Sequence, residues 1–138
     1  MSVSQDFLEY VAEQMEPFGR FAVRRMFSGA GLFRDGLMFA LAIEDVLYFK
    51  ADDTNRGDFE RAGTGPFTYE RSGKQFSLAY FEVPADVLED ADQLSGWARQ
   101  AHGAALRAAQ TARARSAQKR PVRPARAVKS GKPGPGRR

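Results

Sequence analysis

Two adjacent arginines and a glycine-rich segment are the residues of this chain whose types and spacing could bind an anion. Arg24 and Arg25 precede Gly29, Ala30 and Gly31. Guanidinium groups donate paired hydrogen bonds to carboxylates and phosphates, and glycine lets a ligand approach the backbone closely. Neighbouring strand residues point to opposite faces, so the two arginines cannot easily serve one anion. Arg24 and Arg25 are the candidate partner-binding residues: we predict that one recognises a carboxylate or phosphate of a partner and that the other pairs with an acid of the first helix. A structural role for both is the alternative.

The glycine segment itself does not match a phosphate-binding loop. The dinucleotide-binding fingerprint requires a third glycine followed by a helix, whereas Arg34 occupies that position and strand-forming residues follow it. A bend between two strands at Gly29–Gly31 is the structure that we predict.

No group of residues matches the spacing of a catalytic or metal site. His102 is the single histidine, and we expect it at the surface without an acid near it. The pair Asp52 and Asp53 lacks the spacing of a calcium-binding loop. The chain has no cysteine, which excludes thiol nucleophiles, disulfides and zinc–thiolate sites. We therefore predict a protein that is not an enzyme and has no catalytic residue, cofactor or metal ion.

The charged residues divide the chain into two parts of opposite sign. Residues 1–102 hold 10 Lys and Arg and 17 Asp and Glu, a net charge of −7, whereas residues 103–138 hold 11 Lys and Arg and no acid. All aromatic residues lie at or before Trp97, so the basic part cannot build a core. We predict one folded domain over residues 1–102. A basic tail rich in Ala, Arg, Pro and Gly follows over residues 103–138, helical to about residue 118 and then disordered.

The basic tail is the candidate nucleic-acid-binding segment. It has no aromatic residue to stack on a base, so its contacts would be to phosphates and nearly independent of base sequence. A tail that only links or solubilises is the alternative. The cations predicted to contact phosphate are Arg113, Arg115, Lys119, Arg120, Arg123, Arg126, Lys129, Lys132, Arg137 and Arg138.

The pattern of apolar residues predicts an α+β domain that positions these groups. Apolar residues at helical spacing predict a first helix that begins after Ser2 or Ser4. Apolar and alternating runs separated by turn residues predict an antiparallel meander sheet of about five strands. A short middle helix capped by Asp52 or Asp53 and a C-terminal helix from about Asp92 pack on this sheet. The strands are expected within residues 21–28, 31–34, 37–43, 46–50, 67–71 and 75–83.

The chain shows no sign of membrane insertion or export. Its longest uninterrupted apolar run is Leu37–Ile43, far short of the roughly 20 residues that a membrane-spanning helix needs. The first residues contain no basic segment followed by an apolar stretch, so no secretory signal is visible. We expect a soluble, cytoplasmic protein.

Residues 26–40, Met-Phe-Ser-Gly-Ala-Gly-Leu-Phe-Arg-Asp-Gly-Leu-Met-Phe-Ala, resemble the signature of the N-terminal domain of the TfoX/Sxy family. Leu47–Lys50 resembles the strand that follows it, and the resemblance covers about residues 5–101. Ser28 stands where the family usually has glycine, and Phe33 replaces tyrosine. The resemblance implies an α+β domain and a role in regulating competence genes, as a transcriptional co-activator beside a DNA-binding regulator. It supplies no catalytic residue. Longer members carry a second, helical domain where this chain has its basic tail.

These observations lead to two hypotheses about function. The first is a non-enzymatic regulatory module, similar to competence (transformation) co-regulators, that binds a transcription regulator or another protein partner. Its basic tail would add non-specific attraction to nucleic acid, and it would have no membrane partner. The second is a small-ligand-binding domain or an uncharacterised enzyme that uses the Gly29–Gly31 bend together with Arg24 or Arg25.

Overall fold

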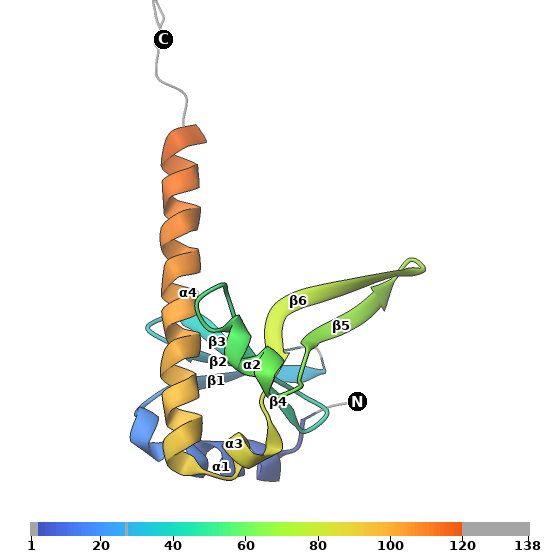
Figure 1. Cartoon of the computed structure of the whole chain (residues 1–138), viewed down its shortest axis with the longest axis vertical. Coiled ribbons are helices and arrows are strands. Elements are labelled where there is room, and N and C mark those ends of the chain that lie inside the picture. Colours follow the sequence, from blue (N-terminus) through green and yellow to red (C-terminus); the bar gives the residue numbers. More distant parts are fainter. Residues whose placement is uncertain (1–2, 27, 120–138) are drawn as a thin grey trace, which may run out of the picture. The chain divides into compact units, whose positions relative to one another are not determined.

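A computed structural model describes residues 3–26 and 28–119 of the chain. Residues Met1–Arg107 form one compact unit, and the chain from Ala108 onward belongs to a second. Figure 1 shows the elements of the chain in sequence order. They are α1 (Gln5–Gln14), the 3-10 turn η1 (Glu16–Phe18), β1 (Ala22–Met26), β2 (Gly29–Arg34), β3 (Leu37–Ile43), β4 (Val46–Lys50), α2 (Arg56–Arg61), β5 (Pro66–Arg71), β6 (Lys74–Glu82), α3 (Ala85–Leu88) and α4 (Ala91–Lys119).

The predicted α+β fold with an antiparallel sheet is confirmed, although the sheet has six strands rather than about five. The strand order is β1-β2-β3-β4-β6-β5, and every neighbouring pair is antiparallel. The order departs from a simple meander at its end, because the last strand, β6, pairs with β4 through Tyr48 and Glu82. Strand β5 is therefore left at one edge of the sheet and β1 at the other.

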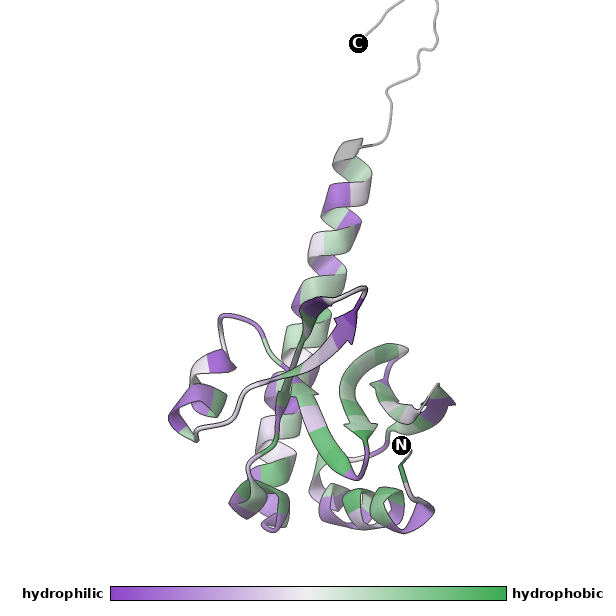
Figure 2. Cartoon of the chain, turned by 90° about the vertical axis from the view of Figure 1, so that its right-hand side faces the viewer, coloured by the Kyte–Doolittle hydropathy of each residue, from purple (hydrophilic) through white to green (hydrophobic). Residues whose placement is uncertain are grey.

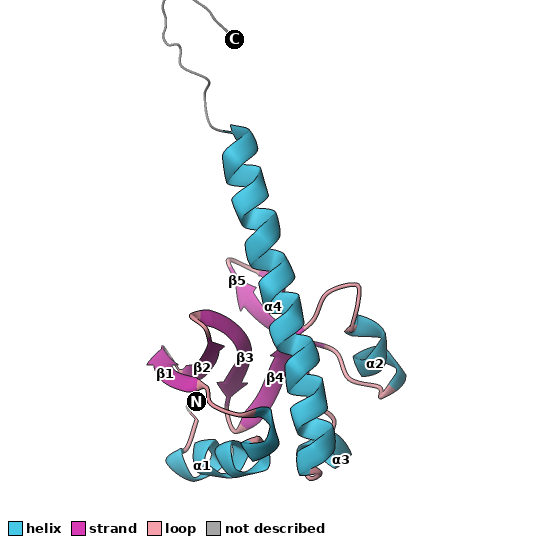
Figure 3. Cartoon of the chain, turned by 90° about the vertical axis from the view of Figure 1, so that its left-hand side faces the viewer, coloured by secondary structure: helices cyan, strands magenta, loops and turns pink. Residues whose placement is uncertain are grey.

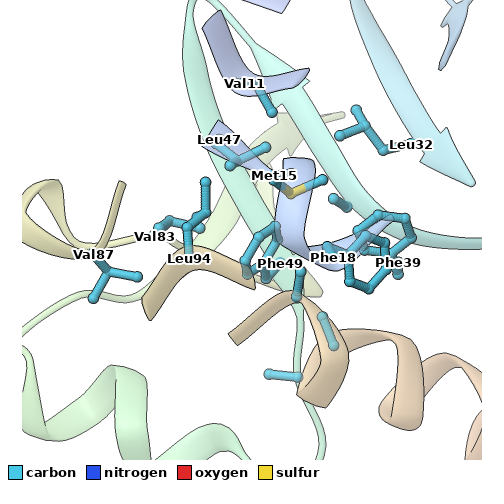
Figure 4. Close-up of a cluster of buried hydrophobic side chains, with 14 of the residues drawn as sticks. Val11, Met15, Phe18, Leu32, Phe39, Leu47, Phe49, Val83, Val87 and Leu94 are labelled. Carbon is cyan, nitrogen blue, oxygen red and sulfur yellow. The ribbon is translucent and has the colours of Figure 1, made fainter. Parts of the chain in front are cut away.

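One face of the sheet carries the hydrophobic core. Figure 3 shows α1 and the first turns of α4 against the strands. Side chains of α1, η1, α3 and this part of α4 pack with those of the sheet in one cluster, and Figure 4 labels ten residues of it. The labelled residues are Val11, Met15, Phe18, Leu32, Phe39, Leu47, Phe49, Val83, Val87 and Leu94. Burial of this many apolar side chains is the main term that stabilises the domain.

The prediction of a bend at Gly29–Gly31 is wrong, because these residues lie inside β2. Gly29 pairs with Met26 of β1, and Gly31 pairs with Arg24. An added Cβ at Gly31 would lie 2.6 Å from the sulfur of Met38, and one at Gly29 would lie 2.5 Å from a backbone oxygen. The glycines therefore allow neighbouring atoms to pack closely over the strand, and they are not needed to turn the chain.

The predicted two-residue turns between strands are confirmed. Asp35 and Gly36 join β2 to β3 with φ values of 54° and 76°. Ser72 and Gly73 join β5 to β6 with the same pair of values. Positive φ at both central residues matches the right-handed twist of the flanking strands, and aspartate and glycine tolerate it well.

The structure decides which residues begin the helices. The Oγ of Ser4 accepts a hydrogen bond from the backbone N–H of Phe7, so Ser4 caps α1 as one of the two predicted candidates. The long helix begins one residue before Asp92, and the carboxylate of Asp90 accepts from the backbone N–H of Gln93. The hydrogen bonds from the backbone and the side chain of Gln93 lower the pKa of Asp90. The predicted start of this helix at about Asp92 thus lies one residue after the observed start.

Neither Asp52 nor Asp53 caps the middle helix as predicted, because α2 begins later, after Asn55. The carboxylate of Asp52 instead accepts two hydrogen bonds from Arg107 of α4, at 2.6 and 3.0 Å. Asn55 is buried, and its amide accepts from the backbone N–H of Asp52 and donates to the carbonyl of Lys50. Local polar groups thus organise the loop after β4 and connect it to α4.

The pair of Asp52 and Arg107 predicts a stability that depends on pH. Hydrogen bonds from Arg107 lower the pKa of Asp52. A carboxyl group whose pKa is lower in the folded protein than in the unfolded chain contributes its full stabilisation above the unfolded-state pKa of about 4. This stabilisation is lost as the pH falls through the lower, folded-state pKa. We expect Asp52→Asn to reduce the free energy of unfolding at neutral pH by up to about 1 kcal/mol, since both side chains are partly exposed.

Urea denaturation at neutral pH and at about pH 3 would test this expectation. The difference between Asp52→Asn and the unmodified protein is expected to shrink at the lower pH. Asp53→Asn is a matched control, because Asp53 pairs with Arg56 but its side chain is 92% exposed. An equal difference at both pH values would contradict the assignment.

Candidate functional site

Arg24 lies in an open depression beside the edge of the sheet. This depression, the arginine cleft, has a volume of about 580 Å³ and is lined by Arg20, Phe21, Arg24, Phe33, Arg34 and Asp35, among others. The guanidinium of Arg24 lies 5.4 Å from the centre of the Phe33 ring. Arg34 lies 4.0 Å over the ring of Phe18 and donates to the Phe18 carbonyl at 2.9 Å. Two of the three guanidinium groups are thus oriented by aromatic rings.

The positive charge of the arginine cleft is largely uncompensated. Among the ion pairs of the described residues, none involves Arg20, Arg24 or Arg34. Asp35 is the single acid among the residues that line the cleft. Three cations without acidic partners stand out in a segment, residues 1–102, whose net charge is −7. The cleft can therefore accept a carboxylate or a phosphate.

Arg25 lies on the other side of β1, as the alternation of strand residues predicts. It donates to the carbonyl of Val3 at 2.9 Å and to the side chain of Gln5 at 3.4 Å. The prediction that one arginine pairs with an acid of the first helix is wrong, because these acceptors are neutral. Arg25 and Val23 line a second depression of about 330 Å³, the helix-side depression, together with Gln5, Leu8, Glu9 and Ala12 of α1.

The expectation that His102 lies at the surface without a nearby acid is wrong. Its side chain is 14% exposed, and its Nε2 lies 3.7 Å from a carboxylate oxygen of Asp35. The ring packs edge-on against Phe39 at 6.3 Å. Within the described residues, Nε2 has no hydrogen-bond partner. Sequence patterns missed this contact because α4 meets the turn between β2 and β3 only in the folded domain.

An apolar groove lies on the face of the sheet opposite the core. It has a volume of about 420 Å³ and is lined mainly by apolar side chains, with Ser28 and Gly29 at one end. Figure 2 shows that several strands of the sheet carry strongly hydrophobic residues. The apolar lining residues are Met26, Met38, Leu41, Ile43, Phe67, Tyr69 and Leu78.

Aromatic contacts continue from this groove along the β5–β6 hairpin. The ring of Phe67 stacks on Tyr69 at 6.3 Å, and Tyr69 stacks on Phe76 at 5.6 Å. The hydroxyl of Tyr80 donates to the carbonyl of Met38 at 3.2 Å, and burial raises the pKa of Tyr80 to about 12. The apolar run Leu37–Ile43 was the sequence signal for this groove. A strand whose residues are apolar on both faces directs apolar side chains into the core on one side of the sheet and toward a second apolar surface on the other.

The glycine segment and the two arginines lie side by side on neighbouring strands, since Arg24 pairs with Gly31 and Arg25 with Ala30, but they line different depressions. Gly29 lies at the apolar groove, whereas Arg24 lines the arginine cleft and Arg25 the helix-side depression. The second hypothesis, in which these residues act on one ligand, is not supported by these three depressions, because none of them includes both Gly29 and an arginine.

Three of the predicted phosphate-binding cations lie in the described part of α4: Arg113 and Arg115, whose side chains are exposed, and Lys119, the last residue of the helix. The predicted helical extension is confirmed, since α4 ends at Lys119. The neighbouring Arg107 is not available in the same way, because it is paired with Asp52. The other predicted cations, and the predicted disorder, lie outside the described residues: Arg120, Arg123, Arg126, Lys129, Lys132, Arg137 and Arg138.

Between residues 3 and 119, with Phe27 left aside, no group of three or more His, Asp and Glu side chains could hold a metal ion. Over that same span, no helix combines the length and the apolar character required to cross a membrane. The surface features of the described domain are thus a cationic cleft, a smaller depression and an apolar groove.

The described part of the chain is thus a small α+β domain with an antiparallel sheet of six strands. The comparison with known families is specific: residues 13–105 match the TfoX N-terminal domain. The chain belongs to this family, and the resemblance seen in its sequence is confirmed.

A curated relative supports this assignment. The DNA transformation protein TfoX1 of Aliivibrio fischeri (strain ATCC 700601 / ES114) is 32% identical over 69 residues. The aligned region is 50% of this chain but 33% of the relative. The chain thus matches about one third of the length of that protein.

Proposed function

We propose that this protein is a competence-related regulatory module that acts by binding and performs no catalysis. The observation that carries the proposal is the match to the TfoX N-terminal domain over residues 13–105. A relative named as a DNA transformation protein supports a competence-related role. The separation of this chain into an acidic domain and a basic tail adds a physical basis for two kinds of contact.

The folded domain binds a protein partner, of which a transcription regulator is the first candidate. The arginine cleft supports this part of the proposal, because Arg20, Arg24 and Arg34 form no ion pair among the described residues. Uncompensated arginines at a surface are well suited to carboxylates of another protein.

The basic tail attracts nucleic acid through its phosphates. Arg113 and Arg115 are exposed on α4, and the chain beyond them carries further cations without any acid. Contacts of this kind give weak binding with little dependence on base sequence.

A mobility-shift titration of double-stranded DNA tests the nucleic-acid part. The matched variant, the neutral-tail protein, is full-length and carries glutamine at the ten predicted cations from Arg113 to Arg138. The unmodified protein is expected to bind and the neutral-tail protein to lose binding. Equal binding by both would remove the role assigned to the tail.

Capture of purified transcription regulators by the neutral-tail protein tests the protein-partner part. Its tail keeps Arg107 as the one cation, and Arg107 is paired with Asp52, so retention would come from the folded domain. Retention of a regulator at about 0.15 M salt, where attraction between surface charges is screened beyond about 8 Å, is the expected result. If none of the transcription regulators encoded in the same genome bound, this part of the proposal would be contradicted.

The apolar groove favours a second candidate function, the binding of a small neutral ligand. Its volume of about 420 Å³ lies within the range of ligand pockets, and none of its lining residues is charged. We expect a panel of neutral aliphatic and aromatic compounds to contain one class that raises the melting temperature by several degrees, as saturation of a site does.

Ser28→Trp is expected to abolish this stabilisation, because Ser28 lines the groove and a larger side chain would fill it. Thr68→Trp is the control, since Thr68 alternates in β5 with the groove residues Phe67 and Tyr69 and so points to the other face. A panel without any stabilising compound would exclude this candidate function.

A further inference from the structure

We propose that β1 is a docking edge at which an extended acidic segment of a partner protein adds to the sheet as a further strand. This inference rests on the proposed binding of a protein partner by the folded domain, and it specifies where the partner binds and what its chemistry is. Strand addition uses backbone hydrogen bonds for affinity and side-chain pockets on the two faces for specificity.

The position of β1 makes such an addition feasible. It is the first strand in the order β1-β2-β3-β4-β6-β5 and pairs on one side with β2. Residues Ala22–Arg25 are all exposed, and Val23, a good strand former, is 41% exposed. An edge strand presents unpaired backbone N–H and C=O groups that another strand can bind.

The other edge of the sheet is less suitable. Strand β5 begins with Pro66, which cannot donate a backbone hydrogen bond, and its pairing with β6 is irregular between Pro66 and Thr68. Its last residues, Glu70 and Arg71, have opposite charges. In β1 both charged residues are arginines, so the charge of this edge has one sign.

Depressions on both faces flank β1, and they match the two-residue period of a strand. Ala22 and Arg24 line the arginine cleft, whereas Val23 and Arg25 line the helix-side depression. Successive side chains of an added strand would point to alternate faces. Every second residue of the partner would therefore enter the arginine cleft, and the residues between them would face α1.

Charge and apolar surface determine which residues fit on each face. On the cleft side, Arg20, Arg24 and Arg34 lack acidic partners in the described part of the chain and would bind carboxylates. On the helix side, Leu8 and Val23 offer apolar contact, while Arg25 already donates to Val3. The fitting partner is a segment that alternates acidic residues with small apolar residues.

A protein segment fits this edge better than a nucleic acid. A phosphate backbone could bind the arginines, but it has no amide groups with which to extend the sheet. Residues 1–102 also carry a net charge of −7, which opposes the approach of a polyanion to the domain as a whole. A short segment with a few carboxylates is repelled less strongly.

The test uses a fluorescein-labelled octapeptide of alternating glutamate and valine, titrated into the full-length neutral-tail protein by fluorescence anisotropy. The neutral tail prevents the acidic peptide from binding to tail cations. Arg24→Glu is expected to weaken binding about tenfold or more, because it replaces an attraction by a repulsion in the cleft. Arg71→Glu is the matched control, since it makes the same charge change at the other edge of the same sheet.

Two further peptides test the backbone hydrogen bonds. One carries N-methyl groups on its glutamates and the other on its valines, so composition and charge are equal. In an added strand the backbone amides of alternate residues point to opposite sides. Either the glutamate amides or the valine amides therefore face β1, and the others face solvent. The two peptides are therefore expected to differ in affinity about tenfold or more, the weaker peptide having lost several hydrogen bonds.

Several outcomes would overturn the inference. Equal affinities of the two methylated peptides would exclude strand addition, and equal weakening by Arg24→Glu and Arg71→Glu would show diffuse charge attraction. An unlabelled oligonucleotide that displaces the peptide in an Arg24-dependent way would identify the cleft as a phosphate site instead. Arg24→Gln, checked for an unchanged melting temperature, guards against a folding defect of the glutamate variant. Should capture of a transcription regulator survive Arg24→Glu, the docking edge is wrong while the proposed function stands.

Discussion

The affinity of the full-length protein for double-stranded DNA is expected to fall about a thousandfold between roughly 50 and 200 mM salt. The tail carries ten predicted phosphate-binding cations. If about half of them neutralise phosphates at one time, counterion release gives a slope of about −5 for log K against log salt. Fluorescence anisotropy with labelled duplexes of different base sequence, over this salt range, measures both the slope and the specificity.

The neutral-tail protein is the control for this prediction, because it keeps the length of the chain and the folded domain. Its binding is expected to be undetectable at every salt concentration. Duplexes of unrelated sequence should bind the unmodified protein with similar affinity, since phosphate contacts carry no base information. A steep slope that persists in the neutral-tail protein would place the DNA contacts on the folded domain and contradict the assignment to the tail.

Phe39→Ala is expected to reduce the free energy of unfolding by about 3–5 kcal/mol, a large part of the stability of a domain of this size. Phe39 is fully buried in the core. Its ring lies 5.0 Å from that of Phe18, 6.1 Å from that of Phe21 and 6.3 Å from that of Phe49. Loss of the ring removes these contacts and leaves a cavity at the point where β3 meets the helices.

Urea denaturation at neutral pH measures this effect. Phe76→Ala serves as the matched control, because Phe76 is 43% exposed and its loss should cost less than about 1.5 kcal/mol. A loss of less than about 1 kcal/mol for Phe39→Ala would mean that the core around this ring repacks, and it would contradict the central place given to Phe39.

Much of the sheet could be predicted because its signals are local. The two-residue turns Asp35–Gly36 and Ser72–Gly73 specify hairpins through their own backbone preferences. The strands Leu37–Ile43 and Val46–Lys50 were predicted with the bounds that the structure shows. The pairing of β6 with β4, by contrast, joins residues far apart in the sequence, and nothing in either strand alone identifies its neighbour.

The candidate surfaces were only partly predictable. Alternation along β1 correctly separated Arg24 from Arg25 by face. It could not identify Arg20 and Arg34 as companions of Arg24, because they come from a loop and from β2. The bend predicted at the glycines of β2 was wrong for the same reason. A turn and a close packing site both favour glycine, and only the neighbours in the folded sheet, Ala42 at Gly29 and Met38 at Gly31, distinguish them.

The sequence by itself determined the family, the antiparallel α+β character and the opposite charges of domain and tail. These properties follow from composition and from neighbours within a few positions. Tertiary structure alone decided that His102 approaches Asp35, that Arg107 binds Asp52 and that depressions flank β1 on both faces. Each of these depends on the way in which a helix and a sheet pack together. That packing brings distant residues within a few ångströms, and no local pattern of side chains records it.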